Sequence, residues 1–456
     1  MTTEAIEIAC FKAYDVRGRV PDQLNETIAY RIGRGYAAFL KPSRVVVGHD
    51  IRNSSVAITD ALVEGLRDSG VDVMHVGICG TEEIYFSTFY YQTDGGIVVT
   101  ASHNPMDYNG LKMVREQSKP ISVDSGLVDI RFNAERGVFP EASRRGTLTT
   151  LDHRDAYIAH LLTYVDAAQL KPLTLVVNSG NGCAGAVVDA LAKHLPFEIV
   201  RVHHEPDGDF PNGVPNPLLP ENRVSTSDAI RASGADLGIA FDGDFDRCFF
   251  FDDQGGFVEG YYIVGLLAEA FLGRHAGSRI VHDPRLKWNT MELVAANGGI
   301  AVETKAGHAF IKERMRNEDA IYGGEMSAHH YFRDFSYCDS GMIPWLLIVE
   351  LMSRKGSKLS ELLGSCMTRY PASGEINRVV DDAPALLADL EARYGGNAVS
   401  VEHVDGLSVE FEQWRFNLRM SNTEPVVRLN VESRGDIPLM RDKTAELLGL
   451  IGGEAG

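Results

Sequence analysis

RVVVGHDIRNSSVAITDALVEGLRDSGVDVMHVG, residues 44–77, places a helical pattern between two short apolar runs. The runs RVVV (44–47) and VDVMHV (71–76) predict strands, because both are rich in β-branched residues and bounded by turn residues. Between them, apolar residues recur every three or four positions, which predicts an amphipathic helix. A strand, a helix and a strand in this order form a βαβ unit with a right-handed crossover. The stretch therefore predicts a parallel sheet covered by helices.

The same pattern occurs twice more along the chain. The second copy is LTLVVNS (173–179), CAGAVVDALAKHL (183–195) and FEIVRVH (197–203), and the third is RIVHDP (279–284), WNTMELVAANG (288–298) and IAVETKAG (300–307). Three copies predict three related α/β domains of about 100 residues each. The runs NRVV (377–380), LSVEFEQWRFNLRM (407–420) and VVRLNVES (426–433) predict a smaller C-terminal α+β domain. The expected domains are residues 1–146, 147–253, 254–368 and 369–456.

The composition is that of a globular protein. Of 456 residues, 44% are hydrophobic and 23% charged, and no apolar run reaches the ~18 residues of a membrane span. The first fifteen residues lack a basic segment followed by an apolar core, and the six cysteines are scattered, so we expect a cytoplasmic protein without disulfides. A net charge of -19 argues against nucleic acid or a membrane as a partner. An anionic substrate would therefore need local cations or a metal.

The stretch GGIVVTASHNPMDYNGLKMV (95–114) runs from a strand into a polar turn. Ser102 and His103 lie in this turn, and Lys112 follows on the next apolar run. A serine at a strand end, beside a histidine and near a lysine, could accept and return a phosphoryl group. The alternative is an ordinary turn, since Ser, Asn and Pro are turn residues.

The stretch DLGIAFDGDFDRCFFFDD (236–253) places three carboxylates in one tight turn. Asp242, Asp244 and Asp246 repel one another unless a cation lies between them. Oxygen ligands favour a hard ion such as Mg²⁺. The pattern departs from a calcium-binding EF-hand, whose sixth and twelfth positions, Gly and Glu, are Arg247 and Asp253 here. The alternative is a solvated acidic hairpin.

Two further turns suggest recognition of a sugar phosphate. Glu325, Ser327 and His329 follow the short strand IYGG (321–324) and could bind sugar hydroxyl groups. In RMSNTEP (419–425), a guanidinium, two hydroxyl groups and backbone N–H groups suit a phosphate dianion. This second turn contains Arg419, Ser421, Asn422 and Thr423. The alternative for the first segment is an ordinary loop, and for the second an ordinary hairpin turn.

Two other motifs are ambiguous. SGNGCAGAVVDAL (179–191) contains G-x-G-x-x-G between a strand and a helix, with Glu205 about 20 residues beyond its last glycine, as in dinucleotide-binding proteins. The glycines are also explained by close helix–sheet packing. In FKAYDVRGRV (11–20), Tyr14 and Arg17 belong either to the functional site or to a surface loop.

The motifs YDVRG, TASHNP, DGDFDR, GEMSAH and RMSNTEP occur in this order over almost the whole chain. In this combination they resemble the α-D-phosphohexomutase superfamily. The resemblance implies three related mixed α/β domains plus a smaller C-terminal α+β domain around a central cleft. Met326, within GEMSAHHYFRDF (324–335), resembles the bacterial phosphomannomutase branch.

The resemblance also implies roles for individual residues. Ser102 is expected to carry the phosphate and, with the three aspartates of the turn, to bind Mg²⁺. The expected catalytic residues are Ser102, His103, Lys112, Arg17, Arg247 and His329, with the general base left open between Lys112 and His329. The expected substrate-binding residues are Tyr14, Arg285, His308, Glu325, Ser327, Arg419, Ser421, Asn422, Thr423 and Arg428, with Arg285 preferred over Lys287.

The implied reaction interconverts mannose 1-phosphate and mannose 6-phosphate through a phosphoserine enzyme and a hexose 1,6-bisphosphate, which also serves as activator. The expected partners are small hexose phosphates, the expected assembly is a monomer or homodimer, and a role in GDP-mannose supply follows. Phosphoglucomutase and phosphoglucosamine mutase activities on the same scaffold stay open. An NAD-linked oxidoreductase and a non-catalytic sugar-phosphate-binding protein are the alternatives from other classes.

Overall fold

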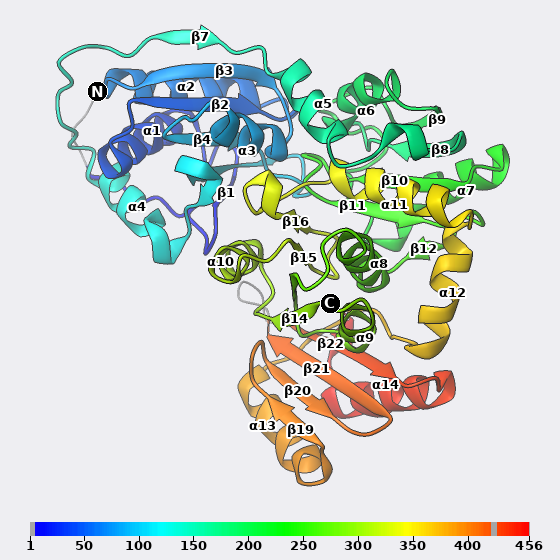
Figure 1. The fold of residues 1–456 in the computed structure, drawn as a ribbon. Coiled ribbons are helices and arrows are strands. Elements are labelled where there is room, and N and C mark those ends of the chain that lie inside the picture. The colour runs from blue at the N-terminus through cyan, green and yellow to red at the C-terminus, as the bar shows by residue number, and fades with distance from the viewer. Residues whose placement is uncertain (1–4, 421–425, 456) are drawn as a thin grey trace. The chain divides into compact units, whose positions relative to one another are not determined.

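The computed structural model describes residues 5–420 and 426–455 (Figure 1). The chain forms two compact units. Unit 1 comprises Met1–Phe257 with Asp334–Arg354, and unit 2 comprises Val258–Arg333 with Lys355–Gly456. None of the described helices is both long and apolar enough to cross a membrane.

The first sheet of unit 1 is mixed, with parallel strands in its centre. Its order is β1 (Val16–Arg19), β5 (Tyr108–Arg115), β4 (Gly95–Val99), β2 (Arg44–His49), β3 (Asp72–Ile78) and β7 (Leu148–Thr150), and β6 (Lys119–Pro120) pairs with β5. Strands β4, β2, β3 and β7 are parallel, whereas β1 and β5 pair antiparallel. The associated helices are α1 (Glu26–Leu40), α2 (Ser55–Asp68), α3 (Thr81–Tyr90) and α4 (Leu127–Arg136).

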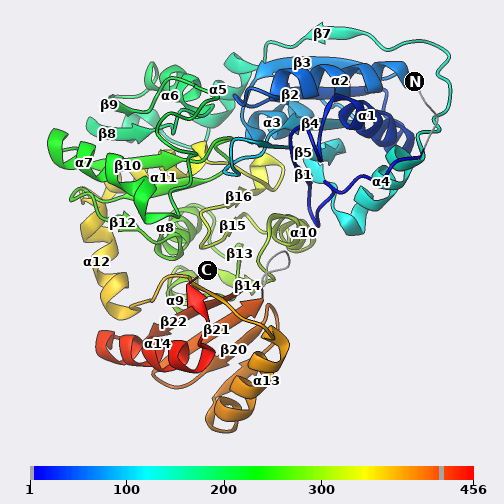
Figure 2. The same ribbon diagram turned by 180° about the vertical axis from the view of Figure 1, so that it is seen from behind.

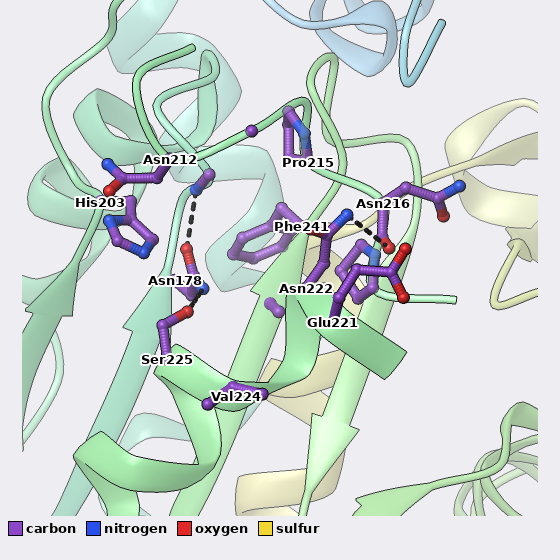
Figure 3. A pocket seen from close by; sticks show the side chains of 14 residues that line it. Asn178, His203, Asn212, Pro215, Asn216, Glu221, Asn222, Val224, Ser225 and Phe241 are labelled. Carbon is purple, nitrogen blue, oxygen red and sulfur yellow. Dashed lines mark hydrogen bonds between the residues drawn. The ribbon is translucent and has the colours of Figure 1, made fainter. Parts of the chain in front are cut away.

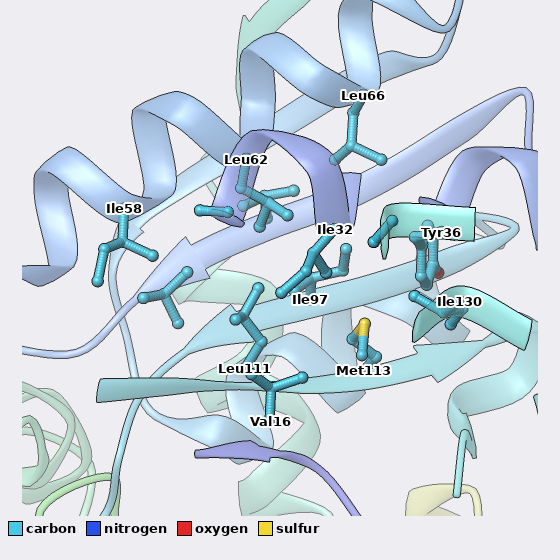
Figure 4. Close-up of a cluster of buried hydrophobic side chains, with 14 of the residues drawn as sticks. Val16, Ile32, Tyr36, Ile58, Leu62, Leu66, Ile97, Leu111, Met113 and Ile130 are labelled. Atoms are coloured by element: carbon cyan, nitrogen blue, oxygen red, sulfur yellow. The ribbon is translucent and has the colours of Figure 1, made fainter. Parts of the chain in front are cut away.

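Helices and strands of the first domain enclose a continuous apolar core (Figure 4). Ile32 and Tyr36 on α1 lie four residues apart, one helical turn, as do Ile58 and Leu62 on α2. They pack with alternate strand residues such as Ile97. Burial of each large apolar side chain contributes about 1.5–3 kcal/mol, so this layer fixes where the strand ends lie.

The second sheet of unit 1 has the order β11 (Cys248–Phe251), β10 (Leu237–Phe241), β8 (Leu173–Asn178) and β9 (Phe197–Val202). Its helices are α5 (Arg154–Leu162), α6 (Ala184–Ala192) and α7 (Val224–Ser233), and β12 (Phe257–Val258) follows β11 along the chain. Strands β10, β8 and β9 are parallel, and β11 returns antiparallel to β10. Unit 1 also contains β17 (Cys338–Asp339) and most of α11 (Met342–Lys355).

Unit 2 begins with a third α/β domain. Its strands run in the order β14 (Ile300–Glu303), β13 (Arg279–His282), β15 (Tyr322–Gly324) and β16 (His330–Phe332). Its helices are α8 (Gly260–Leu272), α9 (Trp288–Ala296), α10 (His308–Glu318) and α12 (Leu359–Arg369). The pairing of β13 with β14 is parallel, as the third copy of the βαβ pattern predicts.

The C-terminal domain is a sheet covered by two helices on one face (Figure 2). Its strands run in the order β19 (Ser400–Glu402), β20 (Leu407–Glu410), β21 (Trp414–Met420), β22 (Val426–Ser433), β18 (Ile376–Val379) and β23 (Glu454–Ala455), and its helices are α13 (Ala383–Tyr394) and α14 (Ile437–Ile451). Phe416 and Leu418 on β21 face this apolar core with Val427 and Leu429 on β22. The alternate residues therefore form a polar face.

The structure confirms the three βαβ units and the α+β domain. The run LSVEFEQWRFNLRM was predicted as one strand. In the structure it folds into two strands, β20 and β21, joined by a tight turn at residues 411–413. The three boundaries between the four domains stay predictions.

Candidate active site

Ser102 lies in a tight turn directly after β4, which we call the serine loop (residues 100–105). Its backbone has φ of 49° and its N–H donates to Thr100 Oγ1 at 3.0 Å. The side chain is 3% exposed, and its Oγ donates to Asp242 Oδ2 at 2.7 Å. The serine predicted from the first domain therefore contacts an aspartate predicted from the second, 140 residues away.

Asp242, Asp244 and Asp246 lie in the turn between β10 and β11, which we call the metal loop (residues 242–247). All three are buried, and one carboxylate oxygen from each lies within 4.8 Å of the other two. Asp244 Oδ1 is buried without a hydrogen-bond partner among the described residues. Three converging carboxylates with an unsatisfied oxygen fit a hard divalent cation. The cluster could therefore bind a metal.

Two cations offset the charge of the metal loop. Lys112 Nζ lies 2.6 Å from Asp244 Oδ2 and also contacts Asp246, and Arg247 Nη2 lies 2.8 Å from Asp242 Oδ2. Burial and then Asp244 raise the pKa of Asp246 well above its usual range. Burial alone would lower the pKa of Lys112, but the two carboxylates raise it. Lys112 is thus a protonated ammonium in this arrangement, which suits charge stabilisation.

His103 lies beside the serine hydroxyl. Its Nδ1 is 3.1 Å from Ser102 Oγ and also contacts Arg247 Nη2. Burial, and then the charges of Arg247 and Arg17, lower the pKa of His103 well below its usual value, so its ring is neutral at physiological pH. Arg17, on β1, donates to Asn104 Oδ1 of the serine loop at 2.8 Å, and Tyr14 lies half-buried in the preceding segment.

Unit 2 holds a second group of predicted residues around Arg285. This guanidinium is buried, with Nη2 2.8 Å from Asp283 Oδ2 and 3.4 Å from Ser327 Oγ. Glu325 Oε1 accepts from the backbone N–H of Gly307 at 2.7 Å, directly before His308 at the start of α10. The segments 307–308 and 325–327 thereby meet.

Glu325 is the centre of this group. Its Oε2 accepts from Tyr331 Oη at 2.5 Å and lies 3.6 Å from His329 Nδ1. Burial raises the pKa of Glu325, while Arg285 acts in the opposite direction. Met326 donates its backbone N–H to Asp283 at 3.0 Å, which fixes the loop. Both carboxylate oxygens accept a hydrogen bond within the protein, and each oxygen has a second lone pair that can accept from a hydroxyl group.

Arg285, Arg419 and Arg428, the arginine cluster, meet at one carboxylate in the same unit. Glu375 Oε2 lies 3.2 Å from Arg419 Nη2 and 3.3 Å from Arg285 Nη1, and its Oε1 lies 3.6 Å from Arg428 Nη1. Burial alone would raise the pKa of Glu375, but the three arginines hold it below its usual value. The cluster can bind an anion. Ser421, Asn422 and Thr423, also predicted here, lie outside the described residues.

Family models and curated relatives match nearly the whole chain. The models are described as phosphoglucomutase/phosphomannomutase alpha/beta/alpha domain I (residues 9–134), domain II (155–256), domain III (259–370) and C-terminal domain (375–447). A phosphomannomutase of Salmonella montevideo is 60% identical, covering 97% of this chain and 99% of its own. A protein of Xanthomonas campestris pv. campestris named phosphohexose mutases is 58% identical, covering 98% of this chain and 100% of its own.

The chain belongs to the phosphoglucomutase/phosphomannomutase family. A solved structure of a phosphoglucomutase/phosphomannomutase family protein from Burkholderia thailandensis superposes on this family member with a TM-score of 0.88 at 32% identity, covering 99% of both chains. The four-domain architecture expected from the motifs is thereby confirmed.

The structure brings the predicted residues of this mutase-family chain into two sets. Unit 1 gathers Ser102, His103, Lys112, Arg17, Arg247 and the three aspartates of the metal loop, with Tyr14 close in sequence to Arg17. Unit 2 gathers Arg285, His308, Glu325, Ser327, His329, Arg419 and Arg428. Lys287, the alternative to Arg285, instead pairs with Glu402 at 2.6 Å. The roles of these residues stay predictions.

The glycine motif of the second domain is explained by packing. A Cβ added at Gly182 would lie 2.6 Å from the carbonyl oxygen of Gly243 in the metal loop, and one at Gly180 would lie 2.3 Å from Pro215. Beside this turn, a cavity of about 340 Å³ opens at the ends of β8 and β10 (Figure 3), where Asn178 bonds to Ser225. None of the described residues lining the cavity is a lysine or arginine to pair with a pyrophosphate. The motif lets the chain approach the metal loop closely.

Three residues at these sites belong to none of the sequence motifs. Arg52, 2% exposed, donates to the carbonyl oxygens of Ser102 at 2.9 Å and Asn104 at 2.6 Å, and also to those of Pro105 and Tyr108. Thr81, the first residue of α3, donates through Oγ1 to Asp244 Oδ2 at 2.5 Å. Glu375 is the third. A basic residue directly after a strand end, in HDIRN (49–53), was the available signal for Arg52.

Proposed function

We propose that this protein is a phosphomannomutase, which interconverts mannose 1-phosphate and mannose 6-phosphate. The observation that carries the proposal is the 2.7 Å hydrogen bond from Ser102 Oγ to Asp242, within a buried loop of three carboxylates. Relatives named phosphomannomutase, 60% and 59% identical over nearly the full chain, support mannose as the substrate. The enzyme is an isomerase that acts as an intramolecular phosphotransferase.

In unit 1, Ser102 is proposed to carry the phosphoryl group between turnovers. A substrate hydroxyl oxygen bonds to phosphorus as the bond from phosphorus to Ser102 Oγ breaks, which gives the hexose 1,6-bisphosphate. After the bisphosphate turns in the site, the phosphorus at the other position bonds to Ser102 Oγ as its bond to the sugar oxygen breaks. Mg²⁺ held by Asp242, Asp244 and Asp246 together with Ser102 would offset the phosphoryl charge. Arg247 and Arg17 add positive charge next to the serine loop.

The substrate hydroxyl must lose its proton to a general base. Lys112 is held protonated by its two carboxylates in the arrangement described, which favours a charge-stabilising role. His329, which lies 3.6 Å from Glu325, is then the stronger of the two predicted candidates. The Ser102 hydroxyl donates its one proton to Asp242, and neutral His103 lies 3.1 Å from the same oxygen as a second polar neighbour.

In unit 2, the buried carboxylate of Glu325 with Ser327 is proposed to bind sugar hydroxyl groups, and the arginine cluster to bind the phosphate that is not transferred. His308 in this unit and Tyr14 in unit 1 are proposed as additional sugar-phosphate contacts. Hexose 1,6-bisphosphate is the expected intermediate and activator. We place the enzyme in the cytoplasm, as a monomer or homodimer.

A second candidate function is phosphoglucomutase activity on the same scaffold. The relative named phosphohexose mutases, 58% identical over 98% of this chain, favours a broader substrate range than mannose alone. The same catalytic residues would serve both sugars, because mannose and glucose differ only in the configuration of one carbon. That difference changes only the contacts to hydroxyl groups.

A substrate panel tests the proposal. Purified protein with Mg²⁺ and a trace of hexose 1,6-bisphosphate is given mannose 1-phosphate, glucose 1-phosphate or glucosamine 6-phosphate, and each product is quantified. We expect kcat/KM to be highest for mannose 1-phosphate and Ser102→Ala to lose at least about a thousandfold in kcat. Ser143→Ala, an exposed serine of the same domain, is the matched control. Full turnover by Ser102→Ala, or a clear preference for glucosamine 6-phosphate, would contradict the assignment.

A further inference from the structure

Two arginines of the C-terminal domain lie directly opposite each other on neighbouring strands. Arg419 on β21 is the register partner of Arg428 on β22, on the polar face of the sheet. Like charges at opposed positions repel and destabilise a strand pair. Arg285 adds a third guanidinium within reach of the same point. The arrangement therefore requires an anion even when no substrate is bound.

Glu375 supplies that anion from inside the protein. It pairs with all three arginines at 3.2–3.6 Å, as described above. The two residues before it are held in place, because Asn430 Nδ2 donates to the carbonyl oxygen of Gly374 at 3.1 Å and the N–H of Val431 donates to Ser373 Oγ at 2.9 Å. Glu375 thus belongs to a fixed segment that enters β18.

The carboxylate of Glu375 and a phosphate group use the same guanidinium donors. We propose that Glu375 is an internal competitor for phosphate at the arginine cluster, which lowers phosphate affinity and keeps the bound phosphate exchangeable. The inference rests on the proposed function, because a reaction through a bisphosphate requires each phosphate in turn to leave the non-transferring position. The side chain of Glu375 is 24% exposed, so it has room to turn toward water when phosphate binds.

Glu375→Gln removes the charge and keeps the shape. With EDTA present to remove metal, titration calorimetry of the full chain with inorganic phosphate should give a Kd about three- to tenfold lower than for the wild type. KM for mannose 1-phosphate should fall by a similar factor and kcat should fall with it, because product release slows. Glu375→Asp keeps the charge at a shorter reach and should give intermediate values.

The control is Glu412→Gln, which makes the same charge change at an exposed position of the same domain and should leave both constants unchanged. An unchanged or weaker phosphate affinity in a folded Glu375→Gln protein overturns the inference. The phosphate titration does not depend on turnover. A wild type without mutase activity, combined with tighter phosphate binding in Glu375→Gln, therefore rejects the proposed function and supports the competitor.

Discussion

Arg52 shows how one side chain can hold a catalytic turn. Its guanidinium donates to four carbonyl oxygens in and after the serine loop, and Asp50 lies 3.4 Å away as its counter-charge. The planar fork of arginine presents five N–H donors in a fixed geometry, whereas a lysine ammonium has three and cannot donate to all four carbonyl groups. The serine loop therefore depends on a residue about 50 positions earlier in the chain.

We predict that Arg52→Lys lowers kcat about ten- to a hundredfold with little change in KM, because Ser102 is no longer held in position. The carbonyl groups left without donors should also lower the free energy of unfolding by about 1–3 kcal/mol. Steady-state kinetics and urea denaturation measure the two effects.

The matched control is Arg231→Lys, since Arg231 is exposed and pairs with Asp228, three residues earlier on the same helix. A wild-type kcat in Arg52→Lys would show that the serine loop holds its shape without this residue.

At the scale of elements, N–H groups at the start of helix α11 donate to a buried carboxyl group on another helix. Glu82 on α3 is 0% exposed and accepts from the backbone N–H groups of Gly341 at 2.5 Å and Met342 at 3.2 Å, and from Ser340 Oγ at 2.8 Å. A Cβ at Gly341 would lie 2.4 Å from the carbonyl oxygen of Phe245, so the residue before α11 also packs closely against the metal loop. Glu82 therefore links α3, α11 and the metal loop within unit 1.

This contact predicts a pH dependence of stability. Burial raises the pKa of Glu82 to about 8 from 4.5, although its hydrogen bonds act in the opposite direction. Between these values the unfolded chain has released the proton and the folded chain retains it, so stability falls as pH rises. The slope attributable to Glu82 is at most about 1.4 kcal/mol per pH unit.

Urea denaturation at pH 5.5 and pH 7.5 measures the effect. The wild type should lose about 2 kcal/mol more than Glu82→Gln between these two pH values, because the glutamine stays neutral throughout. Glu198→Gln, an exposed glutamate on β9, should keep the wild-type slope. Equal slopes in the wild type and Glu82→Gln would mean that Glu82 is ionised in the folded protein.

For the whole molecule, sequence patterns predicted the elements and the ends of strands, but not the contacts between distant segments. Ser102 and Asp242 were both placed after strand ends from local patterns alone, and strand ends gather at one edge of a parallel sheet. By contrast, Thr81 and Asp244 are 163 positions apart, and their hydrogen bond depends on how the first domain packs against the second. No periodicity encodes such a contact. Glu375 was missed for the same reason, since its arginine partners come from three different segments.

The cysteines offer a test of how the whole chain unfolds. All six are free and buried, and burial raises the pKa of Cys10 to about 11, so native thiols should react slowly with a thiol reagent at pH 8. Five of them, Cys10, Cys79, Cys183, Cys248 and Cys338, belong to unit 1, whereas Cys366 belongs to unit 2. Each unit has an apolar core of its own, which favours cooperative unfolding within each unit.

Labelling during urea unfolding should therefore proceed in a group of five thiols and a group of one. Mass spectrometry of the labelled protein should show species with zero, one, five or six modifications and few with two, three or four. Cys366→Ala should remove the single-thiol step and leave the group of five unchanged. Abundant species with two or three modifications would instead show that unit 1 opens in parts, and that its two sheets do not share one cooperative transition.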